Sequence, residues 1–280
     1  MTLASVAAPA QEQQPAAAPA DERCSRMLVS YSDWPEVKNP VFLLGITTPR
    51  GKLYYFGAEH SADPAHPQFA EIEKAWQTFK PTAAFYEGPN RPVALTRDET
   101  IKQAGESGLV RFLAARDNIP FRSLEPPPQE EAAYVMKKYP AEQVMLFYVL
   151  REAARLRDRR KLPEDELKKA VSQLLTQASK MKGFEAVIPN LEALDAAYRK
   201  YWSAPAQWWQ APAEWFDPLR PSSATGGVFT NDINRLSSEY RNLHMYRLLA
   251  GAALEGQRVF AVVGRNHVPM QERALRCALE

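Results

Sequence analysis

The sequence predicts an α/β fold with a central mixed, mostly parallel sheet flanked by helices, and with a helical cap inserted in the middle. Short apolar runs typical of strands alternate with amphipathic helical patterns near the start of the chain and again near its end. Such alternation favours parallel strands with helices packed on the sheet. Between these parts, residues 127–225 contain helical patterns and no convincing strand. We therefore expect residues 26–126 and 226–280 to form two halves of one α/β domain, with residues 127–225 as the cap.

The first half begins with a β-hairpin, because two apolar runs rich in β-branched and aromatic residues flank the turn-rich spacer 47–51. A helix is expected at 67–79, where apolar residues recur at helical spacing between a proline in the first turn and Lys80-Pro81. The remaining elements are predicted to be a strand at 82–86, a helix at 109–115, a strand at 120–124, a helix at 233–254, a strand at 258–263 and a helix at 268–279.

The composition is that of a globular chain, with 45% hydrophobic residues, 24% charged residues and a formal net charge of +2. The one basic run, residues 151–161, lies in a helical pattern and is expected to be a solvated helix face, with a polyanion site as the alternative. We expect no nucleic-acid partner. No stretch of about eighteen apolar residues occurs, and no transmembrane segment is expected.

Residues 1–25 differ in composition from the rest, because they are rich in alanine, proline and glutamine. They are interpreted as the remnant of an export signal followed by a disordered linker, with low-complexity disorder alone as the alternative. An export signal would direct the protein to the periplasm or out of the cell. The two cysteines, Cys24 and Cys277, either form one bridge in an oxidising compartment or remain two unpaired thiols.

Two of the four histidines stand in the same local pattern. Each follows an apolar strand pattern, a glycine and two further residues, which gives the paired elements Gly57 to His60 and Gly264 to His267. In an open α/β sheet, ligands bind beyond the carboxyl ends of the strands, where both histidines are expected. One such histidine alone is more often a hydrogen-bonded surface residue, but the repetition favours a shared active site.

Two further predicted strands end in the carboxylates Glu87 and Glu125. If the four strands are parallel neighbours, both carboxylates meet His60 and His267 at one edge of the sheet. Two imidazoles and a carboxylate can hold Zn²⁺, Mn²⁺ or Co²⁺ and leave a position open for water, so His60, Glu87 and His267 are the expected metal ligands. Glu125 is then a candidate general base. Glu59 is expected to orient a ring, bind the metal or lie in solvent.

Arg241 and Asn242 belong to a polar cluster on the long helix before the last strand. A guanidinium near an activated water would stabilise an oxyanion, although an arginine exposed on a helix surface is the commoner case. The expected substrate-binding residues are Tyr86, Asn242, Asn266, Trp208 and Trp209. The two tryptophans belong to an aromatic stretch of the cap, which would either line a substrate cleft or pack the cap onto the sheet.

Taken in order along the chain, several short motifs resemble the TraB/GumN/Tiki family. They are Gly57-Ala58-Glu59-His60, Lys80-Pro81-Thr82 before the strand that ends at Glu87, Glu239-Tyr240-Arg241-Asn242, and Val262-Val263-Gly264-Arg265-Asn266-His267. The resemblance implies a fold related to the erythromycin esterase and haem-binding ChaN group and, as in Tiki members, metal-dependent peptide hydrolysis with Mn²⁺ or Co²⁺. By position it assigns the family's histidines to His60 and His267, its glutamate to Glu87 and its helical arginine to Arg241.

Two departures from the family pattern concern the metal and the reaction more than the fold. The first motif has Gly-Ala-Glu-His where many relatives have Gly-Thr, and Val268-Pro269 stands where a glycine often follows the second histidine. The leading expectation is a metal-assisted hydrolase of a peptide or of a small-molecule ester or amide. The alternatives are a metal-independent esterase with a histidine as general base, and an envelope protein that binds haem or another small ligand without catalysis.

Overall fold

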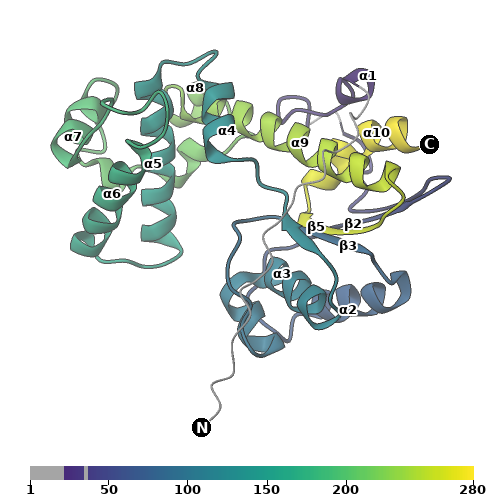
Figure 1. Cartoon of the computed structure of the whole chain (residues 1–280). Helices are drawn as coiled ribbons and strands as arrows, with labels where there is room; N and C mark the ends of the chain where they lie inside the picture. Colours follow the sequence, from purple (N-terminus) through teal and green to yellow (C-terminus); the bar gives the residue numbers. More distant parts are fainter. Residues whose placement is uncertain (1–21, 35–36) are drawn as a thin grey trace, which may run out of the picture.

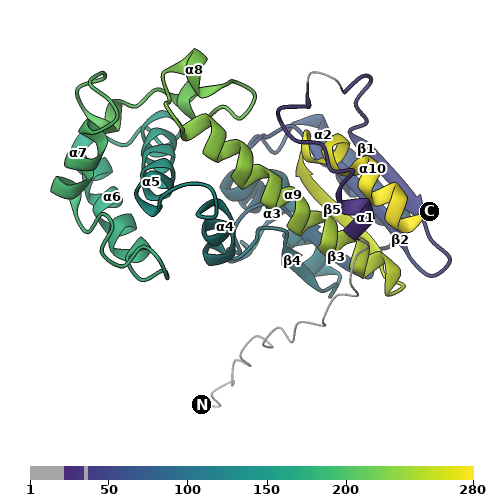
Figure 2. The same ribbon diagram turned by 90° about the horizontal axis from the view of Figure 1, so that it is seen from above.

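The computed structural model describes residues 22–34 and 37–280, so the predicted export signal lies largely outside the described residues. Its fold is the predicted α/β fold: a five-stranded, mostly parallel sheet with helices on both faces, and a helical cap (Figures 1 and 2). None of the helices within the described ranges is long and apolar enough to cross a membrane.

The sheet has the strand order β1-β2-β5-β3-β4. β1 pairs antiparallel with β2 as the predicted hairpin, whereas β2, β5, β3 and β4 are mutually parallel neighbours. The strand bounds are β1 (Leu43–Thr47), β2 (Lys52–Ala58), β3 (Ala83–Tyr86), β4 (Phe121–Ser123) and β5 (Arg258–Gly264). The last strand in the sequence therefore lies at the centre of the sheet, which brings the two ends of the chain together.

Helices cover both faces of the sheet, and successive side chains of β5 point alternately into the two hydrophobic cores that result. Phe260 and Val262 pack with α2 (Pro67–Phe79) and α3 (Arg97–Arg116) on one face. Val259, Ala261 and Val263 pack on the other face with α9 (Thr230–Leu254) and α10 (His267–Leu279). The short helix α1 (Glu22–Ser25) is joined to α10 by a disulfide between Cys24 and Cys277.

The cap has its own hydrophobic core and lies beside the sheet (Figure 1). Its elements are α4 (Pro128–Val135), α5 (Ala141–Asp158), α6 (Glu164–Ala178), α7 (Leu191–Arg199), the 3-10 helices η2 (Trp208–Gln210) and η3 (Ala213–Phe216), and α8 (Ser222–Thr225). Phe229, Ile233 and Leu236 at the start of α9 also belong to this core. One helix, α9, thus runs from the cap to the sheet (Figure 2).

The helix predicted at 109–115 is the second part of a longer element. α3 begins at Arg97, capped by the Thr96 side chain, and its backbone leaves the helical conformation at Ala104 and Gly105. Gly105 has a φ of 55°, and a Cβ there would lie 2.7 Å from the carbonyl oxygen of Ser61. The break in α3 therefore packs tightly against the backbone that follows His60.

Candidate active site

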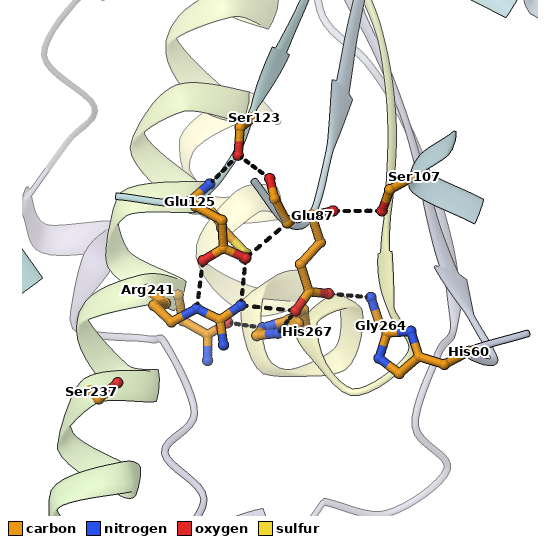
Figure 3. Close-up of polar contacts among 12 residues, drawn as sticks. His60, Glu87, Ser107, Ser123, Glu125, Ser237, Arg241, Gly264 and His267 are labelled. Atoms are coloured by element: carbon orange, nitrogen blue, oxygen red, sulfur yellow. Dashed lines mark hydrogen bonds and ion pairs between the residues drawn. The ribbon is translucent and has the colours of Figure 1, made fainter. Parts of the chain in front are cut away.

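The four predicted strand-end side chains meet at one edge of the sheet (Figure 3). His60 follows β2, Glu87 follows β3, Glu125 follows β4 and His267 begins α10 after β5. Since these four strands run parallel side by side, their carboxyl ends lie on the same edge. The structure thus brings together residues from opposite ends of the chain.

Glu87 is the centre of this arrangement. Its Oε1 accepts a hydrogen bond from Nη2 of Arg241 (2.8 Å) and lies 3.4 Å from Nε2 of His267, while its Oε2 accepts from the backbone N–H of Gly264 (2.6 Å). Burial by itself would raise the pKa of Glu87, but His267, Arg241 and the Gly264 amide outweigh burial and hold that pKa well below its usual range. The carboxylate is therefore ionised at neutral pH.

His60 is held by a carboxylate that the sequence pattern did not indicate. Its Nδ1 donates to Oε1 of Glu106 at 2.5 Å, and Glu106 is buried at the break in α3. The hydrogen bond to Glu106 raises the pKa of His60. The side chain of His60 is 63% exposed, so the ring is open to water and substrate.

Gly264 leaves space between the two motifs. A Cβ at this position would lie 3.1 Å from Nε2 of His60 and 3.1 Å from Oε2 of Glu87. Any side chain would occupy the volume that these two atoms face. Gly57 has a different role, because a Cβ there would collide with the backbone of Arg265 and Phe42. One glycine of the pair opens the site and the other permits close packing.

His267 is held as His60 is, but by an amide. Its Nδ1 donates to Oδ1 of Asn242 (2.7 Å), which also accepts from Nε2 of Gln271 (2.9 Å). The side chain of His267 is only 7% exposed. In both rings, the Nδ1–H bond directs Nε2 toward Glu87. Nε2 of His267 lies 3.4 Å from Oε1 of Glu87.

Arg241 positions the carboxylates. Its Nε and Nη2 donate to the two oxygens of Glu125 (2.9 and 2.8 Å), and Nη2 donates to Glu87 as well. Burial opposes the charge, but Glu125 and Glu87 raise the pKa of Arg241 further above its usual value. Glu125 also accepts from the N–H of Gly88. Arg241 is therefore not the solvent-exposed arginine that is the commoner case on a helix, because it forms a half-buried, two-point ion pair with Glu125.

Glu59 connects the two motifs at the surface. Its carboxylate pairs with Nη1 of Arg265 at 2.7 Å, and the Arg265 N–H donates to the carbonyl of Ala58. Both charged side chains are largely exposed. Of the roles considered for Glu59, the structure therefore supports the solvated one.

The predicted substrate-binding residues are dispersed. Tyr86 is 1% exposed and packs beneath α3, on the opposite face from Glu87, and Trp208 is 2% exposed in the cap core with Trp209 packed against it. Asn242 is buried as the partner of His267. Asn266 is half-buried and directly precedes His267, so it is the member of the set that lies next to the site with part of its surface in solvent. With Trp208 inside the cap, the aromatic stretch gives no support to a haem site.

Sequence reasoning missed Glu106 and Tyr31. Two glycines, Gly105 and Gly108, lie on either side of Glu106 within a helical pattern. Glycines at this spacing indicate a break in the helix, at which the side chain of Glu106 can leave the helical face. Tyr31 precedes β1, and nothing in its neighbours marked it. Burial raises the pKa of Tyr31, and the charges that act on its hydroxyl include Arg241 and Glu87.

The expected metal ligands match a divalent ion in donor type but not in spacing. Arg241 and the Gly264 amide already donate to the oxygens of Glu87. Across residues 22–34 and 37–280, no group of three or more His, Cys, Asp or Glu side chains is arranged so that it could hold a metal ion. We therefore derive no reaction step through a metal from this geometry.

Comparison of the chain with protein-family models, with curated proteins and with solved structures gives no match. The resemblance to the TraB/GumN/Tiki family accordingly rests on the motifs alone.

Proposed function

We propose that this protein is a hydrolase that cleaves an amide or ester bond with a water molecule activated at the paired Gly-x-x-His elements. One observation carries the proposal: both rings have Nδ1 fixed by an acceptor and Nε2 turned toward the ionised Glu87. Ionisable groups that converge in this way, with shifted pKa values, are typical of catalytic sites.

In the proposed reaction, His60 is the general base. Its Nε2 takes a proton from a water molecule in the space beside Gly264, and the water oxygen attacks the carbonyl carbon. Glu106 accepts the Nδ1–H bond and stabilises the imidazolium that forms. When the tetrahedral intermediate collapses, the proton passes from Nε2 of His60 to the leaving nitrogen or oxygen.

The remaining residues of the site hold the charges in place. Glu87 and Asn242 fix His267, and an Nε2–H of that ring would donate to the oxyanion or to Glu87. Arg241 donates from Nε to Glu125 and from Nη2 to Glu87, and its positive charge offsets the charge of these carboxylates. We therefore assign Arg241, Glu125 and Asn242 a positioning role.

A second candidate is metal-assisted hydrolysis, in which His60, Glu87 and His267 hold a divalent ion. The anchoring of both rings favours it, because metal-bound histidines ordinarily donate their other N–H to a carboxylate or carbonyl. The ion would supply a Lewis acid and lower the pKa of a bound water.

We also propose membership of the TraB/GumN/Tiki family and a location in the periplasm or outside the cell. The residues that the resemblance assigns, His60, Glu87, Arg241 and His267, lie in one site, which supports the first. The bond between Cys24 and Cys277 supports the second, because disulfides persist in oxidising compartments.

The test is hydrolysis of a panel of acylated amino-acid esters, amides and short peptides, before and after dialysis against a chelator. We expect hydrolysis that survives chelation and is lost in His60→Ala. Loss on chelation, with recovery on addition of Mn²⁺, Co²⁺ or Zn²⁺, would establish the second candidate instead. Absence of turnover with every member of the panel, with and without added metal, would contradict both.

A further inference from the structure

A groove on the cap presents an arginine, Arg151, that has no salt-bridge partner within the part of the chain that the structure describes. The groove has a volume of about 630 Å³ and lies between α5, η3 and α9, and its lining includes Tyr148, Arg151, Arg155, Arg159, Phe216 and Asn234. Tyr148, Arg151, Arg155 and Arg159 recur at helical spacing and so form one face at the end of α5.

The acidic side chains of the groove are already occupied. Glu152 binds Arg155 through two hydrogen bonds (2.7 and 2.6 Å), and Asp158 binds Arg157 in the same way. Among the described residues, Arg151 forms no salt bridge, and its guanidinium lies 5.6 Å from the ring centre of Phe147. Partial burial of a guanidinium without a carboxylate partner removes water from the charge and so lowers the stability of the folded protein.

The groove is connected to the candidate active site through α9. Asn234 lines the groove, and Ser237 and Arg241 follow on the same face of α9. The hydroxyl of Tyr148 donates to Glu131 (2.9 Å), which also hydrogen-bonds Ser237 (2.5 Å), one turn from Arg241. From Asn234 to Arg241 the helix rises about 10 Å, the length of about three residues of extended peptide.

Charged groups of the groove and of the candidate active site act on one another. Burial lowers the pKa of Arg151, and the neighbouring charges that act on it include Arg241 and Glu125. Glu87 and Arg151 both act on Tyr31, whose pKa burial raises.

We propose that this groove is a substrate subsite in which Arg151, assisted by Arg159, binds a carboxylate of the substrate about three residues from the bond that is cleaved. The inference deepens the proposed function, because it treats the groove as part of the same substrate site. A planar guanidinium binds a carboxylate through two parallel hydrogen bonds, and such bonds gain strength where water is partly excluded. The substrate class is therefore a peptide, or a similar amide, with an acidic group near one end.

The test measures binding and needs no turnover. Acetyl-tetraalanine with a free C-terminal carboxylate and the same peptide with a C-terminal amide are titrated calorimetrically into the full chain carrying Glu87→Gln. We expect the acid to bind about 10- to 100-fold more tightly than the amide. Arg151→Gln should remove this preference, Arg151→Lys should keep part of it, and the matched control Arg155→Gln, at the neighbouring paired arginine, should retain it.

Equal affinities for acid and amide, or no binding of the acid, in the chain whose groove is unaltered would overturn the subsite, whatever Arg151→Gln does to folding. A preference that survives Arg151→Gln in folded protein would overturn the role of Arg151. Inorganic phosphate is the third probe. If phosphate binds more tightly than the acid peptide and displaces it, the groove is a phosphate site, and the proposed carboxylate ligand is overturned. A preference for the acid in a protein that hydrolyses nothing would refute the proposed function and leave the subsite standing, whereas hydrolysis with no such preference would do the reverse.

Discussion

The two Gly-x-x-His elements share a sequence pattern and differ in environment. His60 is mostly exposed and is bound by a carboxylate, whereas His267 is buried and is bound by an amide within a network that includes Gln271. A carboxylate partner favours the charged ring, but an amide partner fixes orientation without a full charge. The first element is thus suited to proton transfer with solvent and substrate, and the second to holding the site in shape.

The largest effect is expected from His60→Ala. If His60 is the general base, kcat/KM should fall by about 100- to 10,000-fold, and the free energy of unfolding should change little because the ring is exposed. His66→Ala, at the half-exposed start of α2, is the control and should retain activity. Retention of activity in His60→Ala would remove the functional distinction between the two elements.

Glu106→Gln tests the carboxylate partner while it keeps the size of the side chain. We expect kcat to fall by about 10- to 100-fold. Since the bond to Glu106 raises the pKa of His60, its removal should lower that pKa and move the acid limb of the pH–rate profile to lower pH. A purely structural role would reduce activity without moving this limb.

Gly264→Ala tests the space between the elements. The added methyl group would lie 3.1 Å from both Nε2 of His60 and Oε2 of Glu87, so we expect about a tenfold loss of kcat/KM through displacement of the reacting groups. Gly45→Ala in β1 is the matched control, because its Cβ would have no neighbour within 4 Å. Full activity in Gly264→Ala would show that the reacting atoms lie elsewhere.

Asn242→Ala tests the second element through stability. Loss of the amide leaves Nδ1 of His267 and the side chain of Gln271 without their buried partner, so the free energy of unfolding in urea should fall by about 1–3 kcal/mol. Glu106→Gln should destabilise the fold less, since its glutamine can still accept from His60. If Asn242→Ala has the same free energy of unfolding as the natural protein, the second element, Gly264 to His267, does not hold the site in shape.

The smallest effect is expected from Glu59→Ala. The pair with Arg265 is exposed at the surface, so its loss should change the free energy of unfolding by less than about 1 kcal/mol and leave kcat/KM unchanged. A large loss of activity would restore the catalytic role first considered for Glu59.

The sequence sufficed for features that follow from sheet geometry. The carboxyl ends of neighbouring parallel strands lie at the same edge of the sheet, regardless of the elements that pack around them. The strand-end glutamates and histidines could therefore be placed together from four short sequence patterns. The alternation of side chains along a strand also shows why Tyr86 failed as a substrate contact: because Glu87 faces the site, Tyr86 must face α3.

Features that depend on packing between distant elements could not be predicted. Glu106 reaches His60 only because α3 breaks at Gly105 and that break packs on the backbone of Ser61. Arg241 and Asn242 appeared polar enough for solvent, but α9 lies against the strand ends, where carboxylates and a histidine satisfy them. A basic helical run likewise does not show that Arg151, unlike Arg155 and Arg157, lacks a carboxylate partner among the described residues.

The bond between Cys24 and Cys277, whose Cα atoms lie 5.5 Å apart, closes the described chain into a ring. In a ring, the order of the residues has no fixed beginning, and the shorter path between His267 and His60 passes through the bridge and not through the cap. A circularly permuted chain, linked at the bridged residues and opened between α5 and α6, would carry both histidines on one uninterrupted stretch. Their separation at opposite ends of the sequence is then only a consequence of where the ring is cut.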